Sequence, residues 1–157
     1  MAEAVIVDSV RTGLSKSFKG GFNQTRADDM TAHIIDALMD RNPSVNPETV
    51  EDVILGCGYP EGPQGNNIAR TSAVLSKLPI KTGGTTVNRY CSSGLQTIAM
   101  AATQIQSGFA DCIIAGGPPM KSSAPETNSV GAEMPEMSSP RSSVSSSSLF
   151  EPSTVWA

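Results

Sequence analysis

Cys91 is the residue of this sequence whose type and position best suit chemistry. It lies in the segment VNRYCSSGL, residues 87–95. A short β-branched run, residues 85–87, precedes it and indicates the end of a strand. Apolar residues then recur at steps of three and four, which predicts a helix; they are Leu95, Ile98, Ala102, Ile105 and Phe109. We therefore expect Cys91 at a strand-to-helix corner, at or just before the N-terminus of the helix.

That position favours reactivity at the sulfur of Cys91. The first amides of a helix have no partners within the helix, and the helix dipole favours negative charge there. We expect a thiol at such a place to ionise more easily, and the thiolate is the nucleophilic form. The same amides can hold an oxyanion. The competing interpretation is an inert cysteine in the core, because free cysteine is among the most buried residue types.

The composition excludes several classes of function. The 157 residues are enough for one domain, and 11 Lys and Arg against 15 Asp and Glu leave a net charge of −4. This balance argues against nucleic acid or an anionic membrane as the main partner, and an aromatic content of 4% argues against a stacking surface for single strands. No apolar run has the length of a membrane span, and the first residues do not resemble a secretory signal or a transit peptide.

The cysteines indicate a reducing environment. The chain has three, Cys57, Cys91 and Cys112, in odd number and without paired spacing. This pattern does not predict a disulfide framework or a zinc site. We therefore expect the protein to lie in the cytoplasm or in another reducing compartment. Cys112 lies within an apolar strand and is predicted to pack in the core.

Short apolar strands alternate with amphipathic helices along the first 117 residues. Strands are expected at residues 4–7, 53–55, 85–87 and 111–115, the first two of them buried; helices are expected over 27–40, from 68 to before Pro79, and after Cys91 to Gly108. This β-α-β-α-β-α-β order predicts an α/β fold with a mostly parallel sheet covered by helices. Ligands of such sheets bind beyond the carboxyl ends of the strands, where Cys91 is expected.

Other candidate residues fit structural roles better. His33 is the one histidine of the chain and lies beside the apolar stripe of the helix over 27–40. We interpret it as a half-exposed surface residue rather than a general base. Gly56, Gly58 and Gly62 do not match the dinucleotide fingerprint, but glycines there allow a tight turn or a close approach of the backbone.

The composition changes after Gly117. Two prolines follow, and eight of the eleven residues 138–148 are serine. We expect a domain over residues 1–117 and an irregular or disordered tail over 118–157. Val155 and Trp156 are candidates for docking on exposed apolar surface.

Four blocks of this sequence resemble the N-terminal half of the thiolases, the acetyl-CoA acyltransferase or 3-ketoacyl-CoA thiolase family. They are VIVDSVRT (5–12), QGNNIAR (64–70), NRYCSSGLQ (88–96) and AGG (115–117). The resemblance covers residues 1 to about 117. It implies a thiolase-like half-domain in which Cys91 takes an acyl group as a thioester from a 3-ketoacyl-CoA or acetyl-CoA and passes it to CoA. It implies no metal and no redox cofactor, and it assigns no cofactor-binding residue.

The resemblance also implies partners and a location. Acyl-CoA and CoA are the expected small molecules. Thiolases are usually dimeric or tetrameric, so a second copy or a full-length thiolase is the expected protein partner. The mitochondrial matrix or the peroxisome would be the compartment in a eukaryote.

The sequence departs from the family after Ala115-Gly116-Gly117. The later family motifs with an activating histidine and a second cysteine are not found, and neither His33, Cys57 nor Cys112 lies in such a motif. General acid–base help contributes about 10²–10⁴-fold to a rate, so we expect a truncated chain with negligible turnover alone. The alternative is a non-catalytic interaction protein that pairs with itself or with a full-length thiolase. A cysteine hydrolase is the least favoured interpretation.

Overall fold

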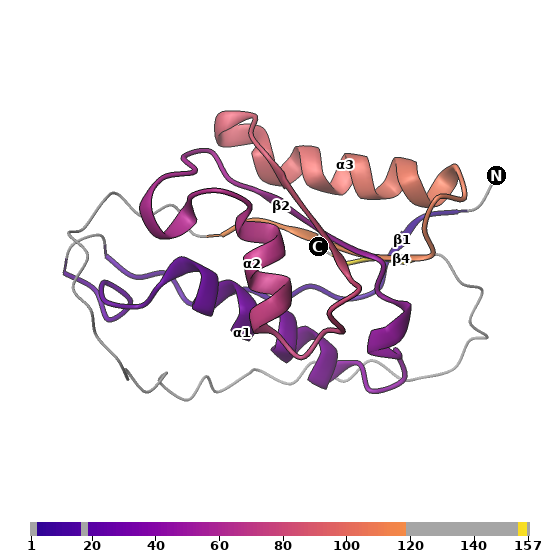
Figure 1. Ribbon diagram of the computed structural model, residues 1–157, viewed down its shortest axis with the longest axis horizontal. Helices are drawn as coiled ribbons and strands as arrows, with labels where there is room; N and C mark the ends of the chain where they lie inside the picture. Colours follow the sequence, from indigo (N-terminus) through magenta and orange to yellow (C-terminus); the bar gives the residue numbers. More distant parts are fainter. Residues whose placement is uncertain (1–2, 17–18, 119–153, 157) are drawn as a thin grey trace.

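A parallel sheet forms the centre of the protein. The computed structural model describes residues 3–16, 19–118 and 154–156, and all structural statements refer to these residues. The strands lie in the order β1-β5-β4-β2-β3, and every neighbouring pair is parallel (Figure 1). The strands are β1 (Val5–Ile6), β2 (Asp52–Gly56), β3 (Gly83–Val87), β4 (Cys112–Gly116) and β5 (Thr154–Trp156). The predicted α/β class is confirmed.

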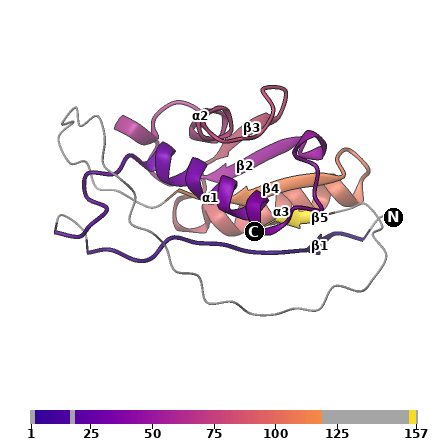
Figure 2. The ribbon, with the colours of Figure 1, turned by 90° about the horizontal axis from the view of Figure 1, so that it is seen from below.

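Three helices cover the sheet. They are α1 (Ala27–Arg41), α2 (Ile68–Leu75) and α3 (Ser93–Gln106), and 3-10 turns form at η1 (Pro47–Thr49), η2 (Gly62–Gln64) and η3 (Tyr90–Ser92). Figures 1 and 2 show α1 and α2 together on one side of the sheet and α3 on the other. The three predicted helices are thus confirmed, and the order of elements places α3 directly after β3.

The side chains of the central strands alternate between the two layers, as the pleat of a strand requires. Val53 and Leu55 pack with α1 and α2, whereas Ile54 packs with α3. Both clusters are closed to solvent. The first contains Ile35, Leu38, Met39, Val50, Val53, Leu55, Ala69, Ala73, Leu78, Cys112 and Ile114; the second contains Ile54, Ala101, Ile105, Ala110, Ile113 and Ala115. β2 and β4 therefore form a core with two apolar faces.

The face that α3 buries differs in part from the predicted one. The buried residues of this helix are Ser93, Thr97, Ala101 and Ile105. By contrast, Leu95 is 73% exposed and Phe109 is 83% exposed. The start of the helix approaches the sheet closely, and the small side chains of Ser93 and Thr97 lie between them. The Thr97 hydroxyl, for example, donates a hydrogen bond of 3.2 Å to the carbonyl oxygen of Gly116 at the end of β4. The predicted helix is confirmed. Of its apolar stripe, Ile105 is buried, and Ile98 and Ala102 are partly buried against the same core cluster; Leu95 and Phe109 are the exposed members.

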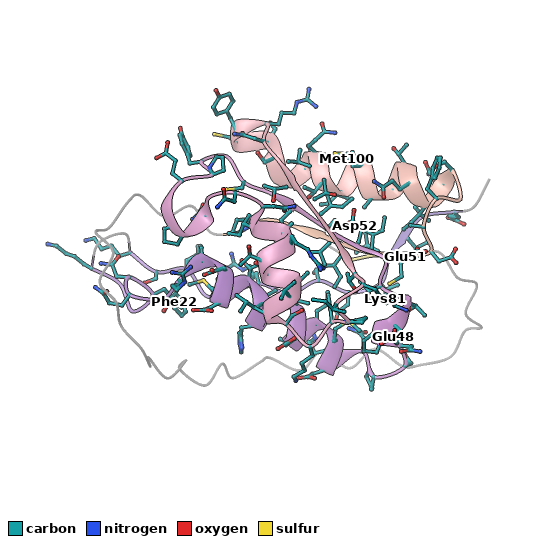
Figure 3. All side chains as sticks on the ribbon, viewed as in Figure 1. Phe22, Glu48, Glu51, Asp52, Lys81 and Met100 are labelled. Atoms are coloured by element: carbon teal, nitrogen blue, oxygen red, sulfur yellow. The ribbon has the colours of Figure 1, made fainter. Side chains whose placement is uncertain are left out.

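A shallow groove follows the outer side of α3. Its lining residues recur at helical spacing and are Gln96, Ala99, Met100, Thr103 and Gln104. Figure 3 labels Met100 on α3, and this side chain is partly buried because it also packs against the core cluster beneath the helix. The same figure shows Glu51 and Asp52 at the amino end of β2, far from the turn that opens α3.

The two ends of the chain differ from prediction in different ways. A strand was expected at residues 4–7, and β1 confirms it, but Val5 and Ile6 are 44% and 59% exposed rather than buried. The reason is topological, because β1 lies at the edge of the sheet described. Within the tail expected to be irregular, Thr154–Trp156 form β5, whose backbone pairs with β1 and β4. The serine-rich stretch 138–148 lies outside the described residues.

Candidate active site

The carboxyl ends of β2 and β3 lie side by side and support the turn that carries Cys91. Gly56 pairs with Val87 in the strand register. One residue later the amide of Cys57 donates a hydrogen bond of 2.8 Å to the carbonyl oxygen of Val87. The chain then leaves β3, forms η3 and enters α3 at Ser93. This arrangement confirms the predicted strand-to-helix corner at the ligand-binding edge of a parallel sheet.

Two glycines allow the backbone of this corner to approach the end of β2 closely. A Cβ atom at Gly56 would lie 2.4 Å from the carbonyl carbon of Ser93, which is closer than any real side chain tolerates. A Cβ atom at Gly58 would lie 3.1 Å from the carbonyl oxygen of Tyr90. The end of β2 and the segment that follows it thus come close to the backbone of the corner on both sides of Cys91. The close approach that the glycines were expected to allow is present, and its partner is the cysteine turn.

Side-chain hydrogen bonds hold the corner in a left-handed backbone conformation. Tyr90 has a φ of 49°, a region that non-glycine residues seldom occupy. The Asn88 side-chain oxygen accepts a hydrogen bond of 3.0 Å from the Tyr90 amide. The Ser93 hydroxyl accepts one of 2.9 Å from the Arg89 amide and donates one of 2.6 Å to the Tyr90 carbonyl oxygen. Residues on both sides of Cys91 therefore hold the turn.

The three cysteines differ in their exposure to solvent. Cys91 is exposed, whereas Cys57 and Cys112 are buried. Cys112 belongs to the cluster under α1 and α2, which confirms its predicted core position. The alternative that Cys91 is an inert core cysteine is wrong, because its side chain is open to solvent. A sulfur in that position can reach a dissolved substrate.

Cys57 is buried and hydrogen-bonded, although it lies only one residue beyond β2. Its side chain packs with Ala27 and Ile68, and its sulfur donates a hydrogen bond of 3.4 Å to the side-chain oxygen of Gln64. Burial raises the pKa of the Cys57 thiol, and a backbone hydrogen bond at Tyr59 opposes this effect only in part. Cys57 therefore stays protonated more readily than a free cysteine.

The surroundings of Cys91 leave room beside the sulfur-bearing turn. A Cβ atom at Gly94 would meet nothing within 4 Å. Tyr90 is exposed, and the guanidinium of Arg89 donates a hydrogen bond to the side-chain oxygen of Gln96 on α3. The Arg89 side chain is thereby folded along the helix, and the first turn of α3 remains uncovered near Gly94.

His33 lies elsewhere in the fold. It is half-buried on α1, in the layer on the other side of the sheet from α3. The predicted half-exposed histidine is thus confirmed. Across the described parts of the chain, no group of three or more His, Cys, Asp or Glu side chains is placed to hold a metal ion. Nor is any helix there long and apolar enough to cross a membrane.

Comparison with known families agrees with this geometry. The family described as "Thiolase, N-terminal domain" matches residues 4–150, nearly the whole chain. The chain belongs to the thiolase family. The matched range includes residues 118–150, beyond the expected boundary at residue 117.

Characterised thiolases align with most of this thiolase chain. A 3-ketoacyl-CoA thiolase of Colwellia psychrerythraea is 44% identical over 117 residues, which are 74% of this chain and 30% of that protein. A beta-ketoadipyl-CoA thiolase of Acinetobacter baylyi is 49% identical over 125 residues, 80% of this chain and 31% of that protein. A 3-ketoacyl-CoA thiolase of Idiomarina loihiensis is 41% identical over 130 residues, 83% and 34% respectively. The chain spans about a third of the length of these relatives.

Sequence reasoning found the candidate nucleophile but missed part of its support. The roles of Asn88 and Ser93 follow from hydrogen bonds that form only once the corner is folded. A signal was present, because small polar side chains that bond to nearby backbone are typical of tight turns. Asn88 stands three residues before Cys91 and Ser93 two residues after it, which places both within reach of the turn.

Proposed function

We propose that Cys91 is the acyl-accepting nucleophile of a thiolase-type acyltransferase. With a 3-ketoacyl-CoA, the Cys91 thiolate attacks the 3-keto carbon and the bond between C2 and C3 breaks. Acetyl-CoA then leaves after taking up a proton, and the remaining acyl group stays on the sulfur. Free CoA next loses its thiol proton, which balances the one taken up by acetyl-CoA, and its thiolate attacks this thioester, forms acyl-CoA and releases the Cys91 thiolate. The covalent intermediate divides one difficult exchange into two easier ones.

The observation that carries this proposal is the exposed Cys91 sulfur on a turn that the fold holds at its ligand edge. Cys57 and Cys112 are buried, so the fold selects one of three thiols for contact with a substrate. The family match supports the chemistry, since the relatives named above are thiolases. Acyl-CoA and CoA are accordingly the proposed small-molecule partners, with no metal or redox group in the reaction.

Acetyl transfer from acetyl-CoA tests the first half of this chemistry. In this step the Cys91 thiolate attacks the thioester carbon, a new S–C bond forms, and CoA leaves as its thiolate. One thioester replaces another, so the step needs no proton transfer. It can be measured without turnover, which the sequence leads us to expect to be negligible for this chain alone.

The experiment uses acetyl-CoA with an isotopically labelled acetyl group and the complete 157-residue chain. Digestion and mass spectrometry then give the label on each cysteine peptide, so that Cys57 and Cys112 are internal controls. We expect label on Cys91, its loss in a Cys91→Ser variant, and its removal by added CoA. Equal label on all three cysteines, or label that persists when the chain is unfolded in urea, would refute the proposal.

We also propose a protein partner for the outer side of α3. Leu95 on α3 and Phe109 in the turn after it are exposed, and the relatives named above are about three times as long as the segment that matches this chain. A longer thiolase chain is therefore the proposed partner of this side. Co-purification with a full-length 3-ketoacyl-CoA thiolase tests it, and a chain that stays monomeric and unbound at high concentration of that protein contradicts it.

A further inference from the structure

Ser93 is a buried side chain whose hydroxyl bridges the two residues that precede Cys91. It is 3% exposed, although its neighbours Ser92 and Gly94 are not buried. The hydroxyl accepts a hydrogen bond from the Arg89 amide and donates one to the Tyr90 carbonyl oxygen, so it acts both as acceptor and as donor. These hydrogen bonds close a ring between Ser93 and residues 89 and 90, and the backbone of Cys91 is part of that ring.

The ring is needed because the turn is not relaxed on its own. Tyr90, directly before the cysteine, has the left-handed φ of 49°. Residues in such conformations persist only where surrounding contacts hold them, and they gather at functional sites. Ser93 holds the turn from the buried side, and Asn88 holds it from the exposed side. Gly56 at the end of β2, and Gly58 just beyond it, lie against the same turn and block movement toward the sheet.

We propose that Ser93 is a positioning residue for Cys91. Its hydroxyl fixes the backbone of residues 89–91 and thereby the direction in which the Cys91 sulfur meets a thioester. This inference rests on the proposed function, because it assumes that Cys91 accepts an acyl group. Misplacement of a reacting atom by about 1 Å can slow a reaction by about 10²-fold. Loss of the hydroxyl should therefore slow acyl transfer while the cysteine stays exposed.

Thr97 provides a matched control one helical turn further along α3. It is fully buried on the same face, and its hydroxyl donates to the carbonyl oxygens of Gly94 and Gly116 at 2.7 and 3.2 Å. The bond to Gly116 attaches the helix to β4, the bond to Gly94 lies within α3, and neither reaches residues 89–91. Thr97→Val removes a buried hydroxyl of the same kind without releasing the turn, so it separates a loss of stability from a loss of positioning.

The test compares the unchanged chain, Ser93→Ala and Thr97→Val by two rates, each measured where circular dichroism shows the chain folded. One is acetylation of Cys91 at saturating acetyl-CoA. The other is alkylation of Cys91 by iodoacetamide, a small reagent whose reaction depends little on the orientation of the sulfur. For Ser93→Ala we expect acetylation to fall at least about tenfold, and alkylation to change less than about threefold, because only the larger substrate must be aligned. Thr97→Val should keep both rates within about twofold of the unchanged chain.

Three results would overturn the role of Ser93. They are an unchanged acetylation rate in Ser93→Ala, an equal fall in Thr97→Val, or a parallel fall of acetylation and alkylation in Ser93→Ala. Should Ser93→Ala not fold, Asn88→Ala releases the same turn from its exposed side, and an unchanged acetylation rate there overturns the proposal as well. Failure of the proposed function is distinct, because it appears as an unchanged chain that takes no acetyl group on Cys91.

Discussion

Adding a methyl group at Gly56 should disturb the cysteine corner more than any other small change to β2. In Gly56→Ala the new Cβ atom would lie 2.4 Å from the carbonyl carbon of Ser93, 2.6 Å from its oxygen and 2.7 Å from the Gly94 amide nitrogen. All three are backbone atoms at the start of α3. No side-chain rotation can relieve the contact, so strand and helix must move apart.

The required movement sets the expected cost. Ordinary contact begins at 3.4 Å, so the 2.4 Å approach to Ser93 demands a shift of about 1.0 Å between β2 and α3. Forcing extra methyl groups into a packed core typically costs about 1–3 kcal/mol, and rigid backbone neighbours place this site near the upper value. For a chain of this size each kcal/mol lowers Tm by about 2–4 °C, so a loss of about 6–12 °C is expected.

Gly94→Ala is the matched control for this prediction. Its Cβ atom would meet nothing within 4 Å, and its position near the start of α3 favours alanine over glycine. We expect a gain of about 0.5–1 kcal/mol rather than a loss. Urea unfolding followed by circular dichroism measures both variants, and alkylation of Cys91 reports on the corner. Equal stabilities of Gly56→Ala and Gly94→Ala would refute the packing of β2 against the turn.

Further predictions concern the face of α3 and the buried thiol. Ile105→Ala should lower the free energy of unfolding by about 2–5 kcal/mol, whereas Phe109→Ser should change it by no more than about 0.5 kcal/mol, as urea unfolding will show. Equal losses would contradict the burial of Ile105 and the exposure of Phe109. Because burial raises the pKa of Cys57, the unfolded chain loses this proton first, and stability should fall as the pH rises above the ordinary thiol value of 9.0. Urea melts from pH 8 to about pH 10 should show a shallower fall in Cys57→Ala.

The elements of the fold could be predicted because their signals are local. Val53–Leu55 is an apolar run bounded by a glycine, and β2 forms there. The spacing of Met30, Ile34 and Leu38 indicated a helix; α1 forms there and buries Met30 and Leu38, with Ile34 partly buried. The corner at Cys91 also depended on adjacent segments, a strand followed directly by a helix. Patterns that lie within about 15 residues of each other were sufficient in all these cases.

The buried face of α3 could not be predicted by the same means. The rule that large apolar residues face the sheet assumes an ordinary distance between the layers. Here Gly56 marks a place with little space, since a Cβ atom there would lie 2.4 Å from the carbonyl carbon of Ser93. Ser93 and Thr97 fill that narrow gap, and both bond to backbone carbonyl oxygens. The cause lies in strands distant in sequence, which periodicity along one helix does not reveal.

The support of the site shows the same division between local and distant causes. Cys91, Asn88 and Ser93 are close in sequence, so the turn that they make has a local signature. Gly56 and Gly58 come more than 30 residues earlier and reach the turn only because β2 and β3 pair in parallel with their carboxyl ends together. A side chain at either glycine would displace the backbone on one side of Cys91. The position of Cys91 is therefore a property of the sheet as a whole, and the proposed activity of the cysteine motif depends on a fold that places these two glycines against its turn.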